Sequence, residues 1–196
     1  MGAGSAAQPT SHLICYTDYN GVLNIGEDTL VDMAEFLVNL DYLKPDISIR
    51  LLSFGGPRRR EQTLQDLAEA GIIDIFDKII FTEYRVGADL PADASMPFTE
   101  QRIFHAHLAR PLIYVNYEIF HGGKDQCILL ATRPSFNETI MFVDDKARIL
   151  EATLELMPSC IGVEMRHHKF FTNSNIFHHV RTLTELKNTI AICNHL

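Results

Sequence analysis

The sequence has no apolar run long enough to cross a lipid bilayer. Its longest uninterrupted apolar run, residues 127–131, falls far short of the ~20 residues that a spanning helix needs. The first residues also lack the basic start and apolar middle of a secretory signal peptide. We therefore expect a soluble, cytoplasmic protein with no membrane partner.

Cysteine is scarce and widely spaced. The four cysteines, Cys15, Cys127, Cys160 and Cys193, form no C-x-x-C pair. The sequence therefore indicates neither a zinc ribbon nor a dithiol redox motif. We expect reduced, buried thiols.

Basic residues are also few compared with acidic residues. The chain has 17 Lys+Arg against 25 Asp+Glu, a formal net charge of −8. Because nonspecific binding to nucleic acid depends on clustered Lys and Arg, we expect no broad nucleic-acid surface. The one basic run, Arg58, Arg59 and Arg60, is typical of a solvated helix start. If these arginines contact a ligand, they would bind a second anionic group on a diphosphate, a nucleotide or an acidic macromolecule.

What the sequence does contain is an alternation of short β-rich runs with longer helix-like stretches over its 196 residues. This pattern predicts an α/β fold in three layers, Rossmann-like, with a mainly parallel central sheet between helices. Residues 1–11 are rich in Gly, Ala and Ser and are expected to form a flexible N-terminal segment. Residues 12–196 are expected to form a single domain.

The expected elements follow from hydrophobic periodicity and turn residues. Strands are predicted over 12–17, 47–53, 77–82, 140–143 and 159–163, and helices over 28–40, 60–70, 124–132, 146–156 and 182–193. Residues 84–123 are irregular, with a helix expected over 99–108 and an extended aromatic run over 112–120. We interpret 84–123 as a small insertion or lid rather than a full cap.

Polar side chains follow three of the predicted parallel strands at their carboxyl ends: Asp18, Ser53 and Asp144. In open α/β sheets this edge is where ligands bind. Carboxylates there can hold a hard cation such as Mg²⁺, and one of them could act as a nucleophile toward phosphorus. A turn after a strand, or an acidic pair at a helix start, explains each motif taken alone.

The sequences around Asp18 and Asp144 resemble two motifs of the haloacid dehalogenase (HAD) superfamily, most of whose members are Mg²⁺-dependent phosphatases. The run ICYTDYNGVL resembles the first motif of that family, which implies that Asp18 is the nucleophile and that the backbone carbonyl of Asn20 is a metal ligand. The run IMFVDD resembles the fourth motif, which implies that Asp144 binds Mg²⁺ and that Asp145 supports it.

Two further positions complete the resemblance. The run ISIRLLS resembles the second motif, so Ser53 would hydrogen-bond the transferring phosphoryl group. Lys124 is our candidate for the lysine of the third motif, where it would bind phosphate, although Lys146 beside the acidic pair is an alternative. Phosphoryl transfer depends on positive charge near the phosphate oxygens, and Mg²⁺ and this lysine would supply it.

The sequence departs from the family at Asn20, where phosphatase members carry an Asp that protonates the leaving group and activates water. An amide cannot exchange a proton in this way, and general acid–base catalysis is worth roughly 10²- to 10⁴-fold. Three interpretations are open: a slow or inactive phosphatase that keeps its ligand site, a member with other chemistry, or an Asp-to-Asn replacement made to capture a complex.

The resemblance therefore implies a Mg²⁺-dependent phosphohydrolase that acts on a phosphomonoester through an aspartyl-phosphate on Asp18, slowed or inactivated by Asn20. The alternative is a catalytically impaired binding or regulatory module that keeps metal and phosphate recognition. The gap of 35 positions between Asp18 and Ser53 excludes a large cap there. A lightly covered site resembles members that act on large substrates, and an oligomer could also close it. The phosphorylated partner, a small molecule or a macromolecule, is left open.

Overall fold

The structure, a computed structural model, describes residues 12–24, 47–85, 98–104, 113–131, 138–165 and 178–180, together with Glu185 and Asn188. In this part of the chain one sheet lies between helices on its two faces. The strands are β1 (His12–Thr17), β2 (Ile47–Phe54), β3 (Lys78–Thr82), β4 (Phe98–Phe104), β5 (Ile113–Phe120), β6 (Glu138–Asp144), β7 (Ile161–Met165) and β8 (His178–Val180). The helices are α2 (Pro57–Glu69), the short 3₁₀ helix η1 (Ile73–Ile75), α3 (Lys124–Ala131) and α4 (Ala147–Leu156).

The strand order is β4-β5-β3-β2-β1-β6-β7-β8. All neighbouring pairs are parallel except β4 with β5, which is antiparallel. This arrangement confirms the predicted α/β fold with a mainly parallel central sheet. Strand β1 lies between β2 and β6, with Tyr16 in register with Arg50 on one side and Phe142 on the other. The carboxyl ends of these three strands therefore meet at one edge.

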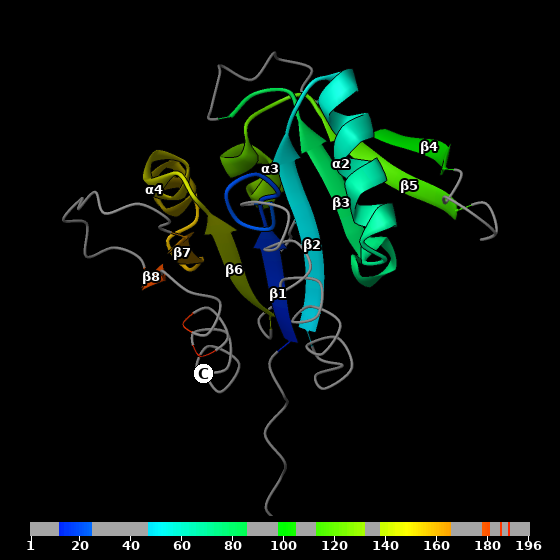
Figure 1. Cartoon of the computed structure of the whole chain (residues 1–196). Coiled ribbons are helices and arrows are strands. Elements are labelled where there is room, and N and C mark those ends of the chain that lie inside the picture. Colours follow the sequence, from blue (N-terminus) through cyan, green and yellow to red (C-terminus); the bar gives the residue numbers. More distant parts are fainter. Residues whose placement is uncertain are drawn as a thin grey trace, which may run out of the picture.

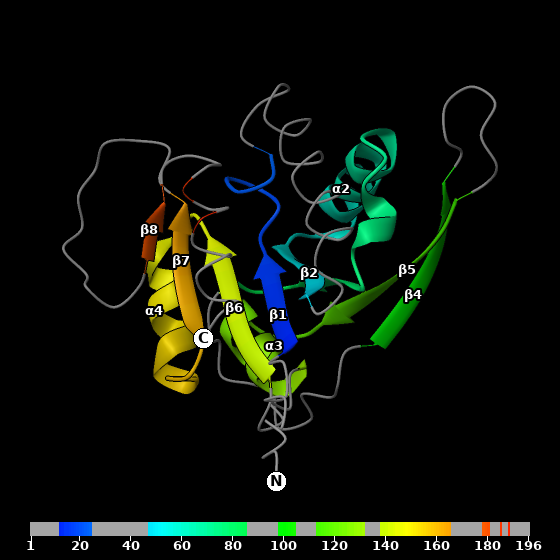
Figure 2. The same ribbon diagram turned by 90° about the horizontal axis from the view of Figure 1, so that it is seen from below.

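Residues that alternate along the strands bury opposite faces of the sheet, as the two-residue period of a strand requires. Leu13 and Cys15 pack in one apolar cluster with Leu64 of α2. Ile14 and Tyr16 pack in a second cluster, which contains buried side chains of α3 and α4. Figures 1 and 2 show α2 on one side of the sheet and α3 with α4 on the other, which makes three layers.

Helix α2 begins earlier than its apolar periodicity predicts, at Pro57 rather than Arg60. Proline fits the first helical position, because its missing N–H needs no partner there and its fixed φ suits a helix. The turn after the helix contains Gly71 with φ +72°, the left-handed conformation that favours glycine. Apart from residues 99–108, the ends of the other predicted strands and helices in the described ranges lie within two residues of the ends in the structure.

The helix expected over 99–108 is wrong where the structure describes it, because Phe98–Phe104 is strand β4. Every residue of β4 is in register with β5, from Phe98 opposite Ile119 to Phe104 opposite Ile113. Pairing with β5, the next strand along the chain, has overridden the local helical pattern. The aromatic run predicted as extended forms β5, which pairs with β3 inside the sheet.

Several expectations lie outside the described residues. They are the flexible segment 1–11, the helix 28–40, residues 86–97 and 105–112 of the expected insertion, and all of the helix 182–193 except Glu185 and Asn188. Within the described part, no helix combines the length and the apolar character that a membrane crossing requires. Cys15, Cys127 and Cys160 are buried thiols, as predicted.

Candidate active site

The carboxylate of Asp18 is fixed directly after β1. Its backbone N–H donates to the carbonyl of Val143 on β6 over 3.0 Å, which prolongs the parallel pairing of the two strands. The backbone N–H of Tyr19 donates to Oδ1 of Asp18 over 2.7 Å. The side chain is buried and held from two directions, so its position follows from the ends of β1 and β6.

The turn that follows Asp18 is closed by backbone hydrogen bonds from Leu23 and Asn24 to the carbonyl of Tyr19. Gly21 in this turn has φ +81°, and a Cβ built on it would lie 2.4 Å from Cγ of Asp145. Only glycine is compatible with both the backbone conformation and this close approach. The Asn-Gly pair of the sequence therefore brings the turn after β1 against the acid after β6.

Tyr19 joins this turn to helix α2. Its hydroxyl donates to Oδ2 of Asp66 over 2.5 Å and accepts from Nδ2 of Asn24 over 3.2 Å. Burial, followed by the neighbouring Asp66 carboxylate, raises the pKa of Tyr19 well above its ordinary value. The phenol stays protonated and serves as a fixed contact between the turn and the helix.

Lys124, the first residue of α3, lies between two carboxylates. Its Nζ is 2.8 Å from Oδ2 of Asp18 and 2.7 Å from Oδ2 of Asp144, and its side chain is only 1% exposed. Burial alone would lower the pKa of Lys124, but the two carboxylates outweigh burial and raise it. Of the two lysines considered from the sequence, Lys124 is the one that contacts both acids. Lys146 is half exposed and pairs with Asp145.

Asp144, the last residue of β6, is fully buried. Burial raises the pKa of Asp144 to about 6, and the like charge of Asp18 contributes to this rise. The ammonium of Lys124 acts in the opposite direction and lowers the pKa, but by less. The backbone N–H of Lys146 donates to Oδ1 of Asp144 over 2.8 Å. A carboxylate in this environment gains from any further positive charge placed beside it.

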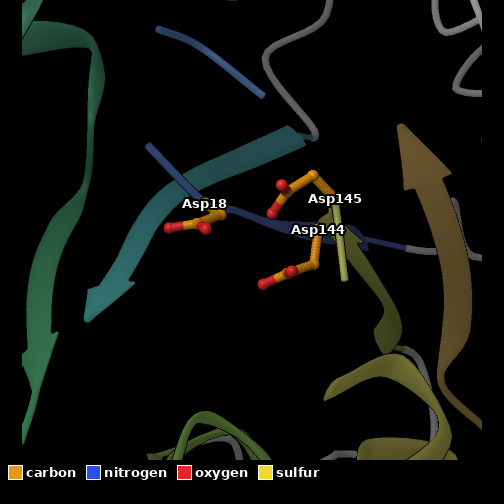
Figure 3. A group of neighbouring side chains, drawn as sticks. All are labelled: Asp18, Asp144 and Asp145. Atoms are coloured by element: carbon orange, nitrogen blue, oxygen red, sulfur yellow. The ribbon is translucent and has the colours of Figure 1, made fainter. Parts of the chain in front are cut away.

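The three acids converge from two neighbouring strands. Figure 3 shows Asp144 and Asp145 at the end of β6 and Asp18 just after β1. One oxygen of each lies within 4.8 Å of the others. Three carboxylate oxygens at this spacing are the hard donors that Mg²⁺ takes in proteins. The donor set fits a divalent cation, since the three acids exceed the charge of the two lysines that pair with them.

A pocket of about 230 Å³ adjoins this group of acids. The side chains and turn residues that line it come from both sides of the sheet edge. They are Asp18, Asn20, Gly21, Phe54, Arg59, Arg85, Lys124, Asp145, Lys146 and Ile149. The structure therefore brings Asp18, Asn20, Lys124 and Asp145 to one pocket, with Asp144 buried beside it.

Ser53, like Asp144, is a predicted site residue that is not among the residues lining the pocket. It is buried near the end of β2, in register with Phe81 of β3. The next residue, Phe54, lines the pocket instead. The predicted hydrogen bond from Ser53 to a phosphoryl group stays a prediction.

Comparisons with known proteins give a likeness in structure but none in sequence. No protein-family model and no curated protein matches this sequence. The structure is similar to the crystal structure of a haloacid dehalogenase-like family hydrolase from Xanthomonas campestris, with a TM-score of 0.53. The similarity covers 95% of this chain and 98% of the other at 8% sequence identity. This chain has a haloacid dehalogenase-like fold.

Within this haloacid dehalogenase-like fold, three pocket residues escaped the sequence analysis: Phe54, Arg85 and Ile149. Arg85 follows β3 as a single basic residue, and Phe54 reads as an ordinary end of a buried strand. Arg59 was noticed only as part of a basic run, and the structure separates that run: Arg60 is buried, whereas Arg58 and Arg59 are exposed and only Arg59 lines the pocket. The helical period of 3.6 residues could have shown that three consecutive arginines point in different directions.

Proposed function

We propose that the protein is a Mg²⁺-dependent phosphohydrolase that acts on a phosphomonoester through an aspartyl-phosphate on Asp18. One observation carries the proposal: Asp18, Asp144 and Asp145 present oxygens within 4.8 Å of one another, and the ammonium of Lys124 bridges Asp18 and Asp144. The haloacid dehalogenase-like fold supports this assignment. A cytoplasmic location stays a prediction.

The residues present are suited to the two halves of such a reaction. In the first half, the Asp18 carboxylate would bond to phosphorus while the ester P–O bond breaks, and the leaving oxygen would take a proton. In the second half, water would attack phosphorus, release inorganic phosphate and restore Asp18. The net reaction consumes one water and forms an alcohol and phosphate.

The site's positive charge would serve both halves. Lys124 holds its proton at neutral pH, so its ammonium can stabilise the phosphoryl oxygens as well as the ionised form of Asp18. Asp18, Asp144 and Asp145, with the carbonyl of Asn20, would hold Mg²⁺, which supplies further positive charge to the phosphate.

Asn20 sets the limit on turnover. It is exposed at the pocket, where its amide can form hydrogen bonds but cannot transfer a proton. Among the described residues that line the pocket, the acids are Asp18 and Asp145, and there is no histidine. Neither acid is free to replace the missing one, because both belong to the proposed nucleophile and metal group. We infer that the proton for the leaving oxygen comes from solvent and that hydrolysis is slow.

The same observation favours the second candidate, a binding or regulatory module. A pocket that keeps its acidic cluster and its buried lysine, but whose described lining residues include no further carboxylic acid and no histidine, can hold a metal and a phosphate without efficient turnover. The two candidates differ in whether phosphate is released.

The test is phosphate release from a panel of phosphomonoesters in Mg²⁺ or EDTA, measured on this chain and on Asn20→Asp. We expect Mg²⁺-dependent release in both, and a gain of at least roughly tenfold in Asn20→Asp, since acid–base catalysis is typically worth more. Intact mass is checked first, because deamidation of the Asn-Gly pair would itself create Asp at position 20.

Asp18→Asn is the matched control, because it keeps the shape of the nucleophile and should abolish release in either background. Release by Asn20→Asp alone would assign the chain with Asn20 to the binding module. No release from either chain, together with Mg²⁺-dependent binding of phosphate, would do the same. No gain from Asn20→Asp in an active enzyme would contradict the limiting role of Asn20.

A further inference from the structure

Two arginines line the same pocket as Asp18 and Asp145. Arg59 lies in the first turn of α2, and Arg85 lies just after β3. Neither forms an ion pair with a carboxylate among the described residues, whereas Lys124 and Lys146 are both paired with acids. The pocket therefore contains two cations, Arg59 and Arg85, that no carboxylate of the described residues compensates.

Both arginines are exposed, and each lies against the end of β2, at Phe54 or Gly55. The guanidinium of Arg85 lies 4.9 Å from the centre of the Phe54 ring. Its backbone carbonyl accepts a hydrogen bond of 3.4 Å from the N–H of Lys124. The stem of Arg59 lies over Gly55, where an added Cβ would come within 3.0 Å of its Cγ and Cδ. Guanidinium groups positioned in this way are suited to bind phosphate oxygens through paired N–H donors.

We propose that Arg59 and Arg85 form a second anion subsite, and that the substrate is a small molecule with two phosphate groups. One phosphate would lie at Asp18 and Lys124, and the other at the arginines. This inference rests on the proposed function, since it takes Asp18 and Lys124 as the place of the reacting phosphate.

The size of the pocket favours a small substrate. Both arginines and Asp18 line the same space of about 230 Å³, below the roughly 300–1,000 Å³ of pockets that enclose a drug-sized ligand. A short scaffold is enough to join two phosphates within such a space. A phosphopeptide would place its second charge on a longer and more flexible chain.

Binding of non-hydrolysable analogues tests the subsite independently of turnover. Calorimetric titration of the Mg²⁺-loaded chain would compare propane-1,3-bisphosphonate with propylphosphonate. We expect the bisphosphonate to bind at least about tenfold more tightly. We expect Arg59→Ala and Arg85→Ala each to reduce this preference by roughly tenfold, since each loses charge-assisted hydrogen bonds to the second group.

Arg58→Ala is the matched control, because Arg58 is exposed in the same helical turn but does not line the pocket. It removes the same charge and leaves chelation of Mg²⁺ by the ligand unchanged, so it should keep the preference. An equal loss in Arg58→Ala would overturn the subsite, because it would show a general charge effect. A preference that survives both Arg59→Ala and Arg85→Ala would overturn it as well.

The outcomes also separate this inference from the proposed function. Mg²⁺-dependent binding of propylphosphonate without any preference for the bisphosphonate would contradict the subsite alone. Binding of neither compound would contradict both the subsite and the phosphate site. Tight binding of a phosphoserine peptide flanked by glutamates, with weak binding of the bisphosphonate, would overturn the small-molecule assignment.

Discussion

Replacement of Lys124 by methionine should be strongly destabilising. The ammonium of Lys124 is 1% exposed and forms charge-assisted hydrogen bonds with two buried carboxylates, at 2.8 Å to Asp18 and 2.7 Å to Asp144. Methionine has a similar length and fills the space, so the change removes the charge rather than the packing. It leaves two like charges in a buried place without their shared partner.

The magnitude follows from the two lost contacts. A hydrogen bond to a charged group contributes about 1.5–3 kcal/mol, and removal of one partner of a buried ion pair costs about 3–5 kcal/mol. We expect a loss near 4 kcal/mol at pH 7, which for a chain of this size lowers Tm by roughly 10 °C. At pH 5, below the pKa of about 6 of Asp144, that group is protonated and the expected loss is smaller.

Urea denaturation in EDTA, followed by circular dichroism, measures this loss. Lys146→Met is the matched control, since Lys146 is half exposed and pairs with Asp145 at the surface, and it should cost no more than about 1 kcal/mol. Added Mg²⁺ should stabilise Lys124→Met more than the chain with Lys124, because the cation replaces part of the missing charge. A loss below 1 kcal/mol for Lys124→Met, or equal losses in the two variants, would refute the reasoning.

Two other predictions follow from the described residues. Gly21→Ala should reduce stability and Mg²⁺ affinity, because its Cβ would overlap Asp145, whereas Gly71→Ala, also at positive φ but with nothing within 4 Å, should cost only about 1 kcal/mol of backbone strain and leave Mg²⁺ affinity unchanged. Burial raises the pKa of Cys160 from 9.0 to about 12, so the folded state keeps this proton and stability should fall as pH rises above 9, by roughly 1.4 kcal/mol per unit. Cys160→Ala should reduce that slope in chemical denaturation between pH 9 and 11; an unchanged slope would contradict the assignment.

The parts of the fold that local sequence determines were predictable. Short apolar runs that end in a polar residue, such as the strands before Asp18 and Asp144, indicate parallel strands with a functional edge, and the structure has those strands. The helix predicted over 99–108 is wrong where the structure describes it, because strand β4 forms by pairing with β5, the next strand along the chain. Local propensity does not contain that information.

The residues of the candidate site also differ in whether the sequence alone could predict them. Asp18, Asp144 and Asp145 could be named from the sequence, because each follows a strand whose carboxyl end faces the ligand edge. Arg85 and the Tyr19–Asp66 hydrogen bond could not, because each depends on how two distant segments meet. Such contacts follow from tertiary packing, which no spacing rule within one segment describes.

Replacement of Asn20 by Asp should lower the affinity for phosphate and raise kcat. The amide lines a pocket that already contains the carboxylates of Asp18 and Asp145, so Asn20→Asp would add negative charge where a dianionic phosphate must bind. A charge at such an exposed position contributes up to about 1 kcal/mol, so phosphate affinity should fall by up to about fivefold while kcat rises by roughly tenfold or more. Stopped-flow binding and steady-state kinetics on the two chains separate these effects. Tighter phosphate binding in Asn20→Asp would contradict the electrostatic reasoning, because an added carboxylate could then not be facing the bound phosphate.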